Sequence, residues 1–429
     1  MTDRPSTYLH FRLDFEQQRK RAKDLLNAAQ AGEPAALARF KSTPKLAEAQ
    51  YLIARDLRFE NWAGLKRHIA AMKSQREVME ERAAADAASA LAIDAELRTL
   101  HVRCGSDLER PLALAGFRGE FYEHSYPYLA GPVRDGGPGC LEERARFIVA
   151  HYDVDGRPRV YDRALEGLQR AEQRLLTSAA YERVVIWSER DCYDQLVLVR
   201  LLGHYATHPR PPLIELINVG DFPGAVRFIG LGQLPPEALR MLWRSRKPVG
   251  SAELELGCEA WRALANPDTR ALAAMMRSGT TALPLLAGAL HRHLRELPSR
   301  INGLSLTQEM ALALLAQEPH SLNRIFGRLN YVLDPLPGQG DSQLRDRLLH
   351  MERSRDRVFT REPGLDRNGQ ARSPWTDVLT ITDRGRAVLR GDVDFRSLDP
   401  PRRWVGGVEI GTDLPDWRWD EEARDAVLR

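Results

Sequence analysis

The sequence predicts an α/β protein, with a mostly parallel, Rossmann-like sheet, flanking helices, an N-terminal helical segment and a C-terminal helical, winged-helix-like domain. Three observations favour this class. Apolar runs alternate with helical-period stretches across 98–232, as in strand–helix repeats. Helical periodicity without strands fills 1–75 and 233–300, and a helix with a later hairpin-and-helix pattern marks 301–429. With 429 residues the chain exceeds one core, and 76–97 is predicted as a linker helix.

The N-terminal segment predicts two amphipathic helices joined by a short turn. Apolar residues recur at steps of three and four in two sets, Leu46, Ala49, Ile53 and Leu57, then Trp62, Leu65 and Ile69. The pair is either a small helical bundle or, because Lys66, Arg67 and His68 lie on its second helix, a helix-turn-helix that binds DNA. Since helix pairs are common and only some read DNA, the bundle is favoured.

Four strands are predicted in the central part, at residues 100–104, 120–123, 184–187 and 213–219. Helical stretches separate them, so the strands should run parallel. In an open parallel sheet, the loops after the carboxyl ends of the strands converge on one crevice. We therefore expect the polar residues that follow these strands, from Asp107 to Asp221, to lie close together.

The C-terminal part predicts helices from Pro235 to about 297, and a further helix that Ser305 caps with Gln308 reaching back. Val378 to Leu389 then predicts a hairpin and helix, which together with the capped helix resembles a winged-helix module. Residues 334–374 between them are rich in Gly, Pro and Arg, and we expect an exposed, mobile insertion there.

The bulk composition excludes some classes of protein. Lys and Arg total 62 against 59 Asp and Glu, a charge of +3, so there is no overall bias toward nucleic acid or anionic membranes. The four cysteines (Cys104, Cys140, Cys192, Cys258) form no CxxC pair and predict reduced thiols in a cytoplasmic protein. No opening apolar region or run of about 18 apolar residues predicts export or a membrane span.

Several separated motifs resemble one family. They are HVRCGSDL, WSERDCYDQL, RFIGLGQL, NGLSLTQE and RWVGGVEI…WRWD, and they agree in order over about residues 98–420. The chain is similar to bacterial proteins filed as a domain of unknown function, in which an N-terminal α/β domain is paired with a C-terminal partner domain. The resemblance implies this architecture and assigns no catalytic roles.

Two details refine the resemblance. The family's third-strand motif reads closer to W-F-E-H-D, whereas Ser188 and Arg190 stand at two of those positions here. A catalytic or ligating histidine at the second of them would therefore be missing from this chain. The N-terminal stretch AQYLIARDLRFENWAGLKRHI resembles a helical segment of assorted bacterial proteins, including some with ankyrin repeats, and implies architecture only.

Three acids follow the third predicted strand, in VVIWSERDCYDQ. If a helix starts near Asp191, then Asp191 caps it, while Asp194 and Gln195 occupy its first turn, where an acid gains about 0.3–1 kcal/mol from the helix dipole. That interpretation leaves Glu189 unexplained. Alternatively the three carboxylates work as acid/base groups or bind Mg²⁺ or Mn²⁺, with Gln195 contacting a ligand.

Four further residues are candidates for ligand binding or catalysis. Ser106 and Asp107, where a strand meets a helix, either cap that helix or hold a phosphate or carboxylate. His124, in a loop with two prolines, is either a surface histidine or a general base or ligand, because its unperturbed pKa of ~6.5 suits proton transfer. Arg227 either clamps an anion or forms a structural ion pair.

Other chemistries lack support in the sequence. One glycine after the first strand makes neither a dinucleotide fingerprint nor a P-loop, and no GxSxG motif is present. His204 and His208 are four residues apart, but we expect His208 in a loop, where helical pairing fails. Without an HExxH motif or a Cys/His cluster, zinc is disfavoured.

Two hypotheses follow. In the first, an enzyme or ligand-binding protein takes a small anionic or phosphate-bearing ligand at the strand ends. In the second, a non-catalytic regulatory or adaptor protein contacts DNA or a protein partner through its helical and winged-helix-like ends. Arginines at the C-terminal end would bind phosphates in the DNA variant: Arg384, Arg386, Arg390, Arg402 and Arg403.

Overall fold

The computed structural model describes residues 11–84, 92–152, 159–225, 227–366, 369–370 and 372–429. The chain forms two compact units. The first unit comprises Met1–Glu123, Glu182–Glu189 and Leu213–Pro248. The second unit comprises His124–Tyr181, Arg190–Pro212 and Val249–Arg429. Part of the predicted linker helix, residues 85–91, lies outside the described residues.

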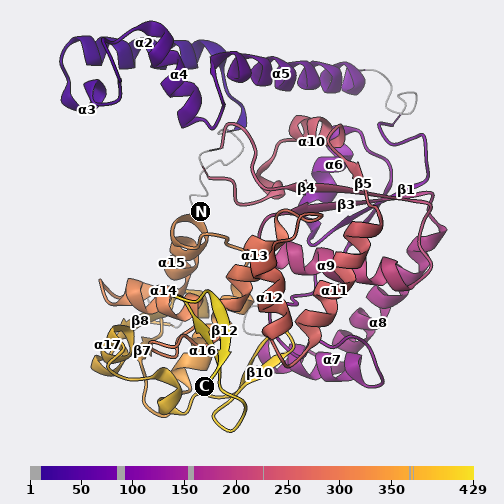
Figure 1. Ribbon diagram of the computed structural model, residues 1–429, viewed down its shortest axis with the longest axis vertical. Coiled ribbons are helices and arrows are strands. Elements are labelled where there is room, and N and C mark those ends of the chain that lie inside the picture. Colours follow the sequence, from indigo (N-terminus) through magenta and orange to yellow (C-terminus); the bar gives the residue numbers. More distant parts are fainter. Residues whose placement is uncertain (1–10, 85–91, 153–158, 226, 367–368, 371) are drawn as a thin grey trace. The chain divides into compact units, whose positions relative to one another are not determined.

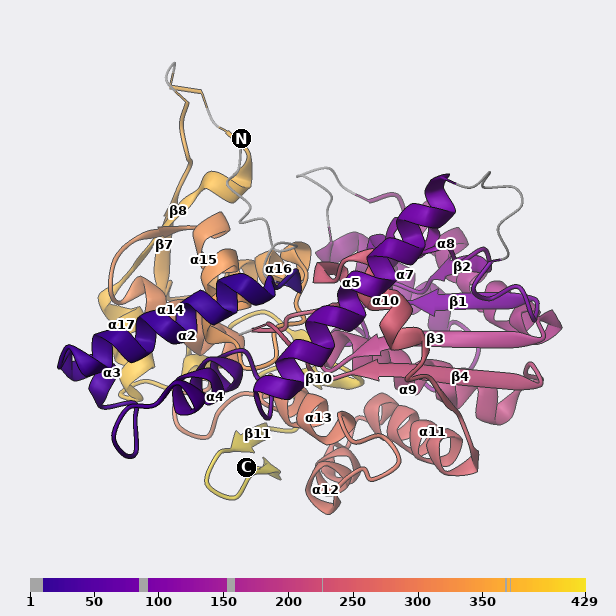
Figure 2. The same ribbon diagram turned by 90° about the horizontal axis from the view of Figure 1, so that it is seen from above.

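A five-stranded sheet lies in the first unit, in the order β2-β1-β3-β4-β5. Figure 2 shows β2, β1, β3 and β4 side by side in that order. Its strands are β1 Thr99–Arg103, β2 Glu120–Glu123, β3 Arg183–Glu189, β4 Leu213–Val219 and β5 Lys247–Pro248. The first four are parallel, and β5 alone runs antiparallel, to β4. The predicted mostly parallel α/β sheet is thus confirmed, and the short edge strand β5 was not predicted.

The adjacent strands β1 and β3 are buried along their whole length. This burial explains why the sequence of β3 contains a continuous apolar run. One side is covered by η1 Ser106–Leu108, α6 Glu109–Ala115, η3 Leu231–Gln233 and α10 Pro236–Trp243. Trp187 of β3 and Trp243 of α10 belong to this core. The Trp187 indole N–H also donates to Nδ1 of His101 (3.1 Å), whose Nε2 lies 2.9 Å from Asp94.

The N-terminal helices have a small core of their own. They are α2 Phe15–Gln30, α3 Pro34–Leu37, α4 Leu46–Asp56 and α5 Trp62–Ala84. The predicted helix pair is thus present, and its second helix continues into the stretch predicted as a linker. Both Arg12 and Arg76 pair with the buried carboxylate of Glu237 in α10, at 2.9 and 3.3 Å. These ion pairs attach the helices to the remainder of the first unit.

Figure 1 labels four helices of the second unit: α7 Cys140–His151, α8 Tyr161–Thr177, α9 Cys192–Thr207 and α11 Ser251–Ala265. Residues of all four line a cavity. Here α9 and α11 pack closely because glycine stands at two contacts. A Cβ on Gly203 would lie 3.3 Å from that of Trp261, and a Cβ on Gly257 would clash with Leu202. The short helix η2 Ser178–Ala180 extends α8.

Two further helices of the second unit, α12 Arg270–Ser278 and α13 Leu286–Leu294, confirm the predicted helical stretch. Arg292 of α13 is buried and pairs with two carboxylates, Glu296 (2.7 Å) and Asp334 (2.7 Å). Thr307 joins this network, because the Arg292 guanidinium also donates to its hydroxyl at 2.9 Å.

The C-terminal part combines helices with a small antiparallel sheet of order β6-β8-β7. The elements in chain order are α14 Leu306–Leu315, β6 His320–Ser321, α15 Leu322–Arg328, the π-helix η4 Leu329–Leu333, α16 Asp341–Glu352, β7 Phe359–Glu362, η5 Pro374–Thr376, β8 Val378–Ile381, α17 Asp383–Arg390 and η6 Phe395–Leu398. Ser305 caps α14 as predicted: its hydroxyl accepts from the Gln308 N–H, and the Gln308 side chain accepts from the Ser305 N–H.

The prediction of an exposed insertion at residues 334–374 is wrong for much of that range. Asp334 is buried by its pairing with Arg292, and α16 places three apolar residues in the core of this part (Leu344, Leu348 and Met351). The Gly and Pro residues at 335–340 therefore mark a tight connection between two packed helices. Residues 367–368 and 371 lie outside the described residues.

Two hairpins complete the second unit: β9 Arg403–Val405 with β10 Val408–Ile410, and β11 Trp417–Asp420 with β12 Asp425–Leu428. Within the described ranges, no helix combines the length and apolar character that crossing a bilayer requires.

Candidate functional site

The ends of two central strands do converge within the first unit. Arg103, the last residue of β1, lies 3.1 Å from Glu189, the last residue of β3, and donates to Asp107 at 3.2 Å. Glu189 also accepts the backbone N–H of Leu231. One guanidinium thus serves both acids, as expected for a structural ion-pair network.

The loop over these strand ends approaches closely because it contains glycine. A Cβ on Gly230 would lie 2.6 Å from an oxygen of Glu189, and a Cβ on Gly232 would lie 2.6 Å from one of Asp107. Residues 230–232 are therefore packed directly on the two acids.

Three predictions for the first unit need correction or placement. Neither Ser106 nor Asp107 caps α6, because no side chain accepts a hydrogen bond at that helix start and Asp107 turns to Arg103 instead. Asp221 pairs with Arg58 of the N-terminal segment at 2.9 Å. Arg227 is partly exposed in the loop after β4.

The three acids of the VVIWSERDCYDQ motif are divided between the units, since the boundary follows Glu189. Asp191 caps α9 as predicted: its Oδ1 accepts the N–H of Asp194 at 2.8 Å. Asp194 and Gln195 are buried in the first turn. The helix-start interpretation thus accounts for the position of Asp191 and Asp194.

A buried charged neighbourhood surrounds this helix start in the second unit. Burial, together with Asp191 and two further acids, raises the pKa of the Cys192 thiol well above its usual value, although Arg292 opposes the shift. Gly338 lies against Asp191, with 2.7 Å from its Cβ position to Oδ1. Asp191 and Asp194 offer the oxygen ligands that Mg²⁺ prefers, but paired carboxylates are not by themselves evidence of an ion.

His124 is neither a surface histidine nor an accessible base. It is fully buried, and its Nε2 lies 2.9 Å from the hydroxyl of Tyr128. Burial, with smaller contributions from Arg200 and His204, lowers the pKa of His124 to about 3, while burial raises that of Tyr128 to about 12. Both groups are therefore uncharged near neutral pH, and His124 orients Tyr128.

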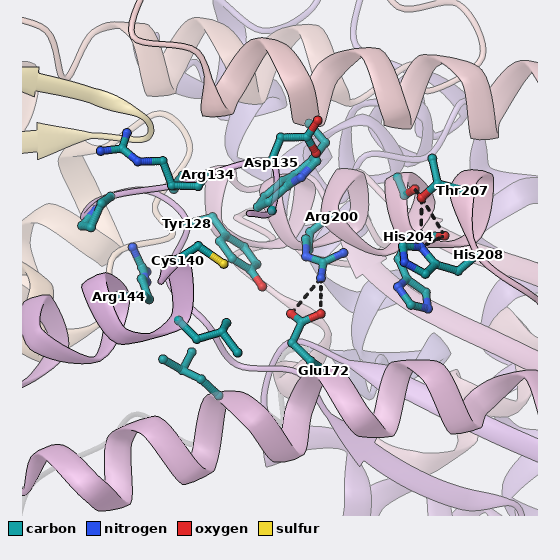
Figure 3. Close-up of a pocket in the computed structure, with 17 residues that line it drawn as sticks. Tyr128, Arg134, Asp135, Cys140, Arg144, Glu172, Arg200, His204, Thr207 and His208 are labelled. Carbon is teal, nitrogen blue, oxygen red and sulfur yellow. Dashed lines mark hydrogen bonds and ion pairs between the residues drawn. The ribbon is translucent and has the colours of Figure 1, made fainter. Parts of the chain in front are cut away.

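Tyr128 lines a cavity of about 360 Å³ within the second unit (Figure 3). Four helices and the loop 128–136 contribute to it. Its lining includes the side chains of Val133, Arg134, Asp135, Cys140, Leu141, Arg144, Leu168, Glu172, Arg200, His204, His208 and Trp261. Its volume falls in the range of small-molecule sites.

Arg144 is the buried cation of this cavity. Its guanidinium donates to the carbonyls of Ala130 (2.5 Å) and Pro127 (2.6 Å) and lies over the rings of Tyr128 and Phe147. Among the described residues no carboxylate pairs with it. Burial accordingly lowers the pKa of Arg144, and the interactions that oppose this effect come from Tyr152, Tyr128 and Tyr193 rather than from a carboxylate.

The other charged side chains of the cavity are paired. Arg200 binds Glu172 at 2.5 Å and lies over the ring of Trp261. Burial alone would lower the pKa of Arg200, but its interactions with Tyr128 and Glu172 raise that pKa above its usual value. Arg134 pairs with Glu143 (3.0 Å), and Asp135 with Arg262 (3.7 Å).

His204 and His208 do pair, contrary to expectation. Because α9 extends to Thr207, His208 is its C-cap, and the two rings stack with centroids 4.4 Å apart. His208 Nδ1 lies 2.9 Å from the Thr207 hydroxyl. Burial, with Arg200 and His208 as further causes, lowers the pKa of His204 to about 4.

Sequence reasoning missed most residues of the cavity. In the sequence, Arg144 lies among the charged residues of LEERARF, and Arg200 is a polar break in the apolar stretch LVLVRLLG. Only that break was a usable signal, since a lone arginine within LVLVRLLG must find a partner once buried.

No family model and no curated protein matches the chain.

Proposed function

We propose that this chain binds a small anionic ligand in the cavity of the second unit. The carrying observation is Arg144, a buried cation in the cavity wall without a carboxylate partner among the described residues. A buried charge is costly unless an opposite charge approaches it. An anion in the cavity would supply that charge.

The strand ends of the first unit remain an alternative place for the same ligand. Arg103 there is already shared between Glu189 and Asp107, and Leu231 donates to Glu189. An added anion would have to displace an acid, which makes this position less favourable than the cavity. For the second unit alone, we keep the proposal that Asp191 and Asp194 work as acid/base groups or hold Mg²⁺ or Mn²⁺.

Cys140 allows a test that localises the site, because it lies in the cavity wall. The protein, with Cys104 and Cys258 replaced by serine, would be alkylated with iodoacetamide in the presence of nucleotides, sugar phosphates and carboxylates. An anion that raises the melting temperature should also slow alkylation of Cys140. A stabilising anion that leaves Cys140 alkylation unchanged would place the site elsewhere.

The finer architecture also belongs to this proposal. The parallel order β2-β1-β3-β4 supports a Rossmann-like α/β domain. The chain order α14, β6, α15, α16, β7, β8 with sheet order β6-β8-β7 supports a winged-helix-like module. All four cysteines are free thiols, which supports a reducing compartment.

The module favours a protein contact over DNA binding as the second candidate function. Of the helices, α16 occupies the place of a recognition helix, but Arg347 on it is buried against Glu296 (3.4 Å), and Asp346 pairs with His151 of α7 (2.9 Å). Along α16 only Asp341 is exposed, so this helix offers little surface to a major groove. An electrophoretic mobility shift at low salt would contradict this assignment.

A further inference from the structure

The charge balance of the cavity specifies the ligand more closely than "anionic". Three arginines and two acids line it, a formal charge of +1 with the histidines neutral. Pairing accounts for all but one of these charges: Arg200 with Glu172, Arg134 with Glu143, and Asp135 with Arg262. The remaining charge is that of Arg144, so one negative charge balances the cavity.

A second negative charge would be unfavourable. Glu172 and Asp135 are themselves in the wall, and a dianion would be repelled by both. His204 is buried and uncharged near neutral pH, so it would not offset a second charge. This balance separates a carboxylate from a phosphate monoester, which carries about −1.5 to −2 charges at pH 7.

Apolar side chains surround Arg144. Leu141 precedes it by one turn on α7, Leu168 faces the cavity from α8, and Val133 is buried in the loop 128–136, before α7. Trp261 adds an aromatic wall beside Arg200. A ligand consisting only of a charged group would leave these surfaces against water, whereas an apolar body would cover them.

Arg200 has capacity for a direct contact. Both of its hydrogen bonds to Glu172 come from Nη2, whereas a guanidinium has five N–H donors. Figure 3 shows Arg144 and Arg200 on either side of Tyr128, both within the cavity lining. Arg200 also hydrogen-bonds Tyr128. A carboxylate would accept from the donors of Arg200 that neither Glu172 nor Tyr128 uses, while balancing Arg144.

We infer that the cavity binds a monocarboxylate with a compact apolar body. This inference rests on the proposed function and narrows it to one class of ligand. It makes phosphate esters and nucleotides poor ligands, and it requires both the single charge and the apolar body.

The test is calorimetric titration of the full chain at pH 8 with four matched probes. Hydrocinnamate carries the charge and the body, hydrocinnamamide lacks the charge, acetate lacks the body, and phenyl phosphate has a second charge. We expect hydrocinnamate to bind at least about tenfold more tightly than the other three, a difference of about 1.4 kcal/mol.

Three variants assign the contributions. R144Q, which keeps a hydrogen-bond donor but removes the charge, should abolish the preference for hydrocinnamate over its amide. L141W, at a half-buried position, should weaken hydrocinnamate at least tenfold by filling the apolar end, and leave acetate unchanged. The control R270Q removes an exposed arginine paired with Asp268 and should change nothing. Melting curves establish that each variant folds.

The outcomes separate the inference from the proposed function. Tighter binding of phenyl phosphate than of hydrocinnamate would overturn the monocarboxylate assignment and leave an anion site in place. Equal binding of the amide would overturn both. Saturation by none of the four probes would also overturn both. If R144Q fails to fold, L141W still tests whether the apolar body of the ligand contributes to binding, and the amide probe tests the contribution of its charge.

Discussion

Arg103 ends one central strand and Glu189 ends its neighbour, and the two side chains meet at 3.1 Å. Their contact follows from the register of the parallel strands, in which Arg103 stands opposite Trp187, two residues before Glu189. The strand ends of the first unit therefore gather opposite charges rather than acids alone.

Asp191 should tolerate asparagine but not alanine, if its role is to cap α9. The asparagine side chain accepts a hydrogen bond from the Asp194 N–H as aspartate does. The free energy of unfolding of D191N should therefore lie within about 0.5 kcal/mol of the wild-type value, whereas that of D191A should be lower by about 1 kcal/mol. Urea denaturation measures both. If D191N is as unstable as D191A, the charge matters beyond the cap, and an acid/base or metal role gains support.

Asp94 should make the first unit sensitive to acid. Burial alone would raise its pKa, but hydrogen bonds from His101 and the N–H groups of Arg118 and Gly119 lower that pKa to about 2. The folded pKa is thus below the unfolded value of ~3.9, so Asp94 stabilises the fold above about pH 4, and this contribution disappears as the pH falls toward 2.

The expected loss in D94N is therefore about 2 kcal/mol at pH 7 and much less at pH 2. Thermal unfolding at a series of pH values measures the difference. As a control, D56N alters an exposed pair with Arg39 and should give a small, pH-independent change. Parallel stability curves for D94N and the wild type would contradict the assigned pKa.

Arg292 should be essential to the stability of the second unit. R292M leaves Glu296 and Asp334 buried without their shared cation, which costs about 3–5 kcal/mol. Burial alone would raise the pKa of Glu296, but Arg292 and then Arg347 lower it to about 2. R292M should therefore regain part of its stability at low pH, where both acids are protonated. No such recovery would disprove the buried-charge explanation.

Gly257 should resist substitution because α9 and α11 approach each other there. In G257A the new methyl group would clash with Leu202, and we expect a loss of about 1–3 kcal/mol. The matched control is G288A in α13, where the nearest atom would lie 3.7 Å away, and alanine should be neutral or stabilising by up to about 1 kcal/mol. Equal melting temperatures for the two variants would contradict the close packing.

Features that depend on neighbouring residues could be predicted from the sequence. The four parallel strands follow from apolar runs such as VVIW, and the caps at Asp191 and Ser305 follow from spacing alone. Each of these features depends on interactions between residues that are close together in the sequence. Those predictions are confirmed at nearly the expected boundaries.

Features that depend on distant partners could not be predicted. His124 is buried near Arg200 and His204 of α9, which lie more than 70 residues along the chain, and Asp334 is buried where Arg292, 42 residues away, pairs with it. The local composition predicted exposure in both cases. The cavity was missed for the same reason, since its wall comes from a loop and four helices that no single pattern connects.

Arg144 has a consequence for kinetics. By holding the carbonyls of Pro127 and Ala130, it fixes the loop that forms one wall of the cavity before any ligand arrives. The entropy of ordering that wall is then lost during folding and not during association. Ligands of different affinity should consequently enter at similar rates and differ mainly in residence time.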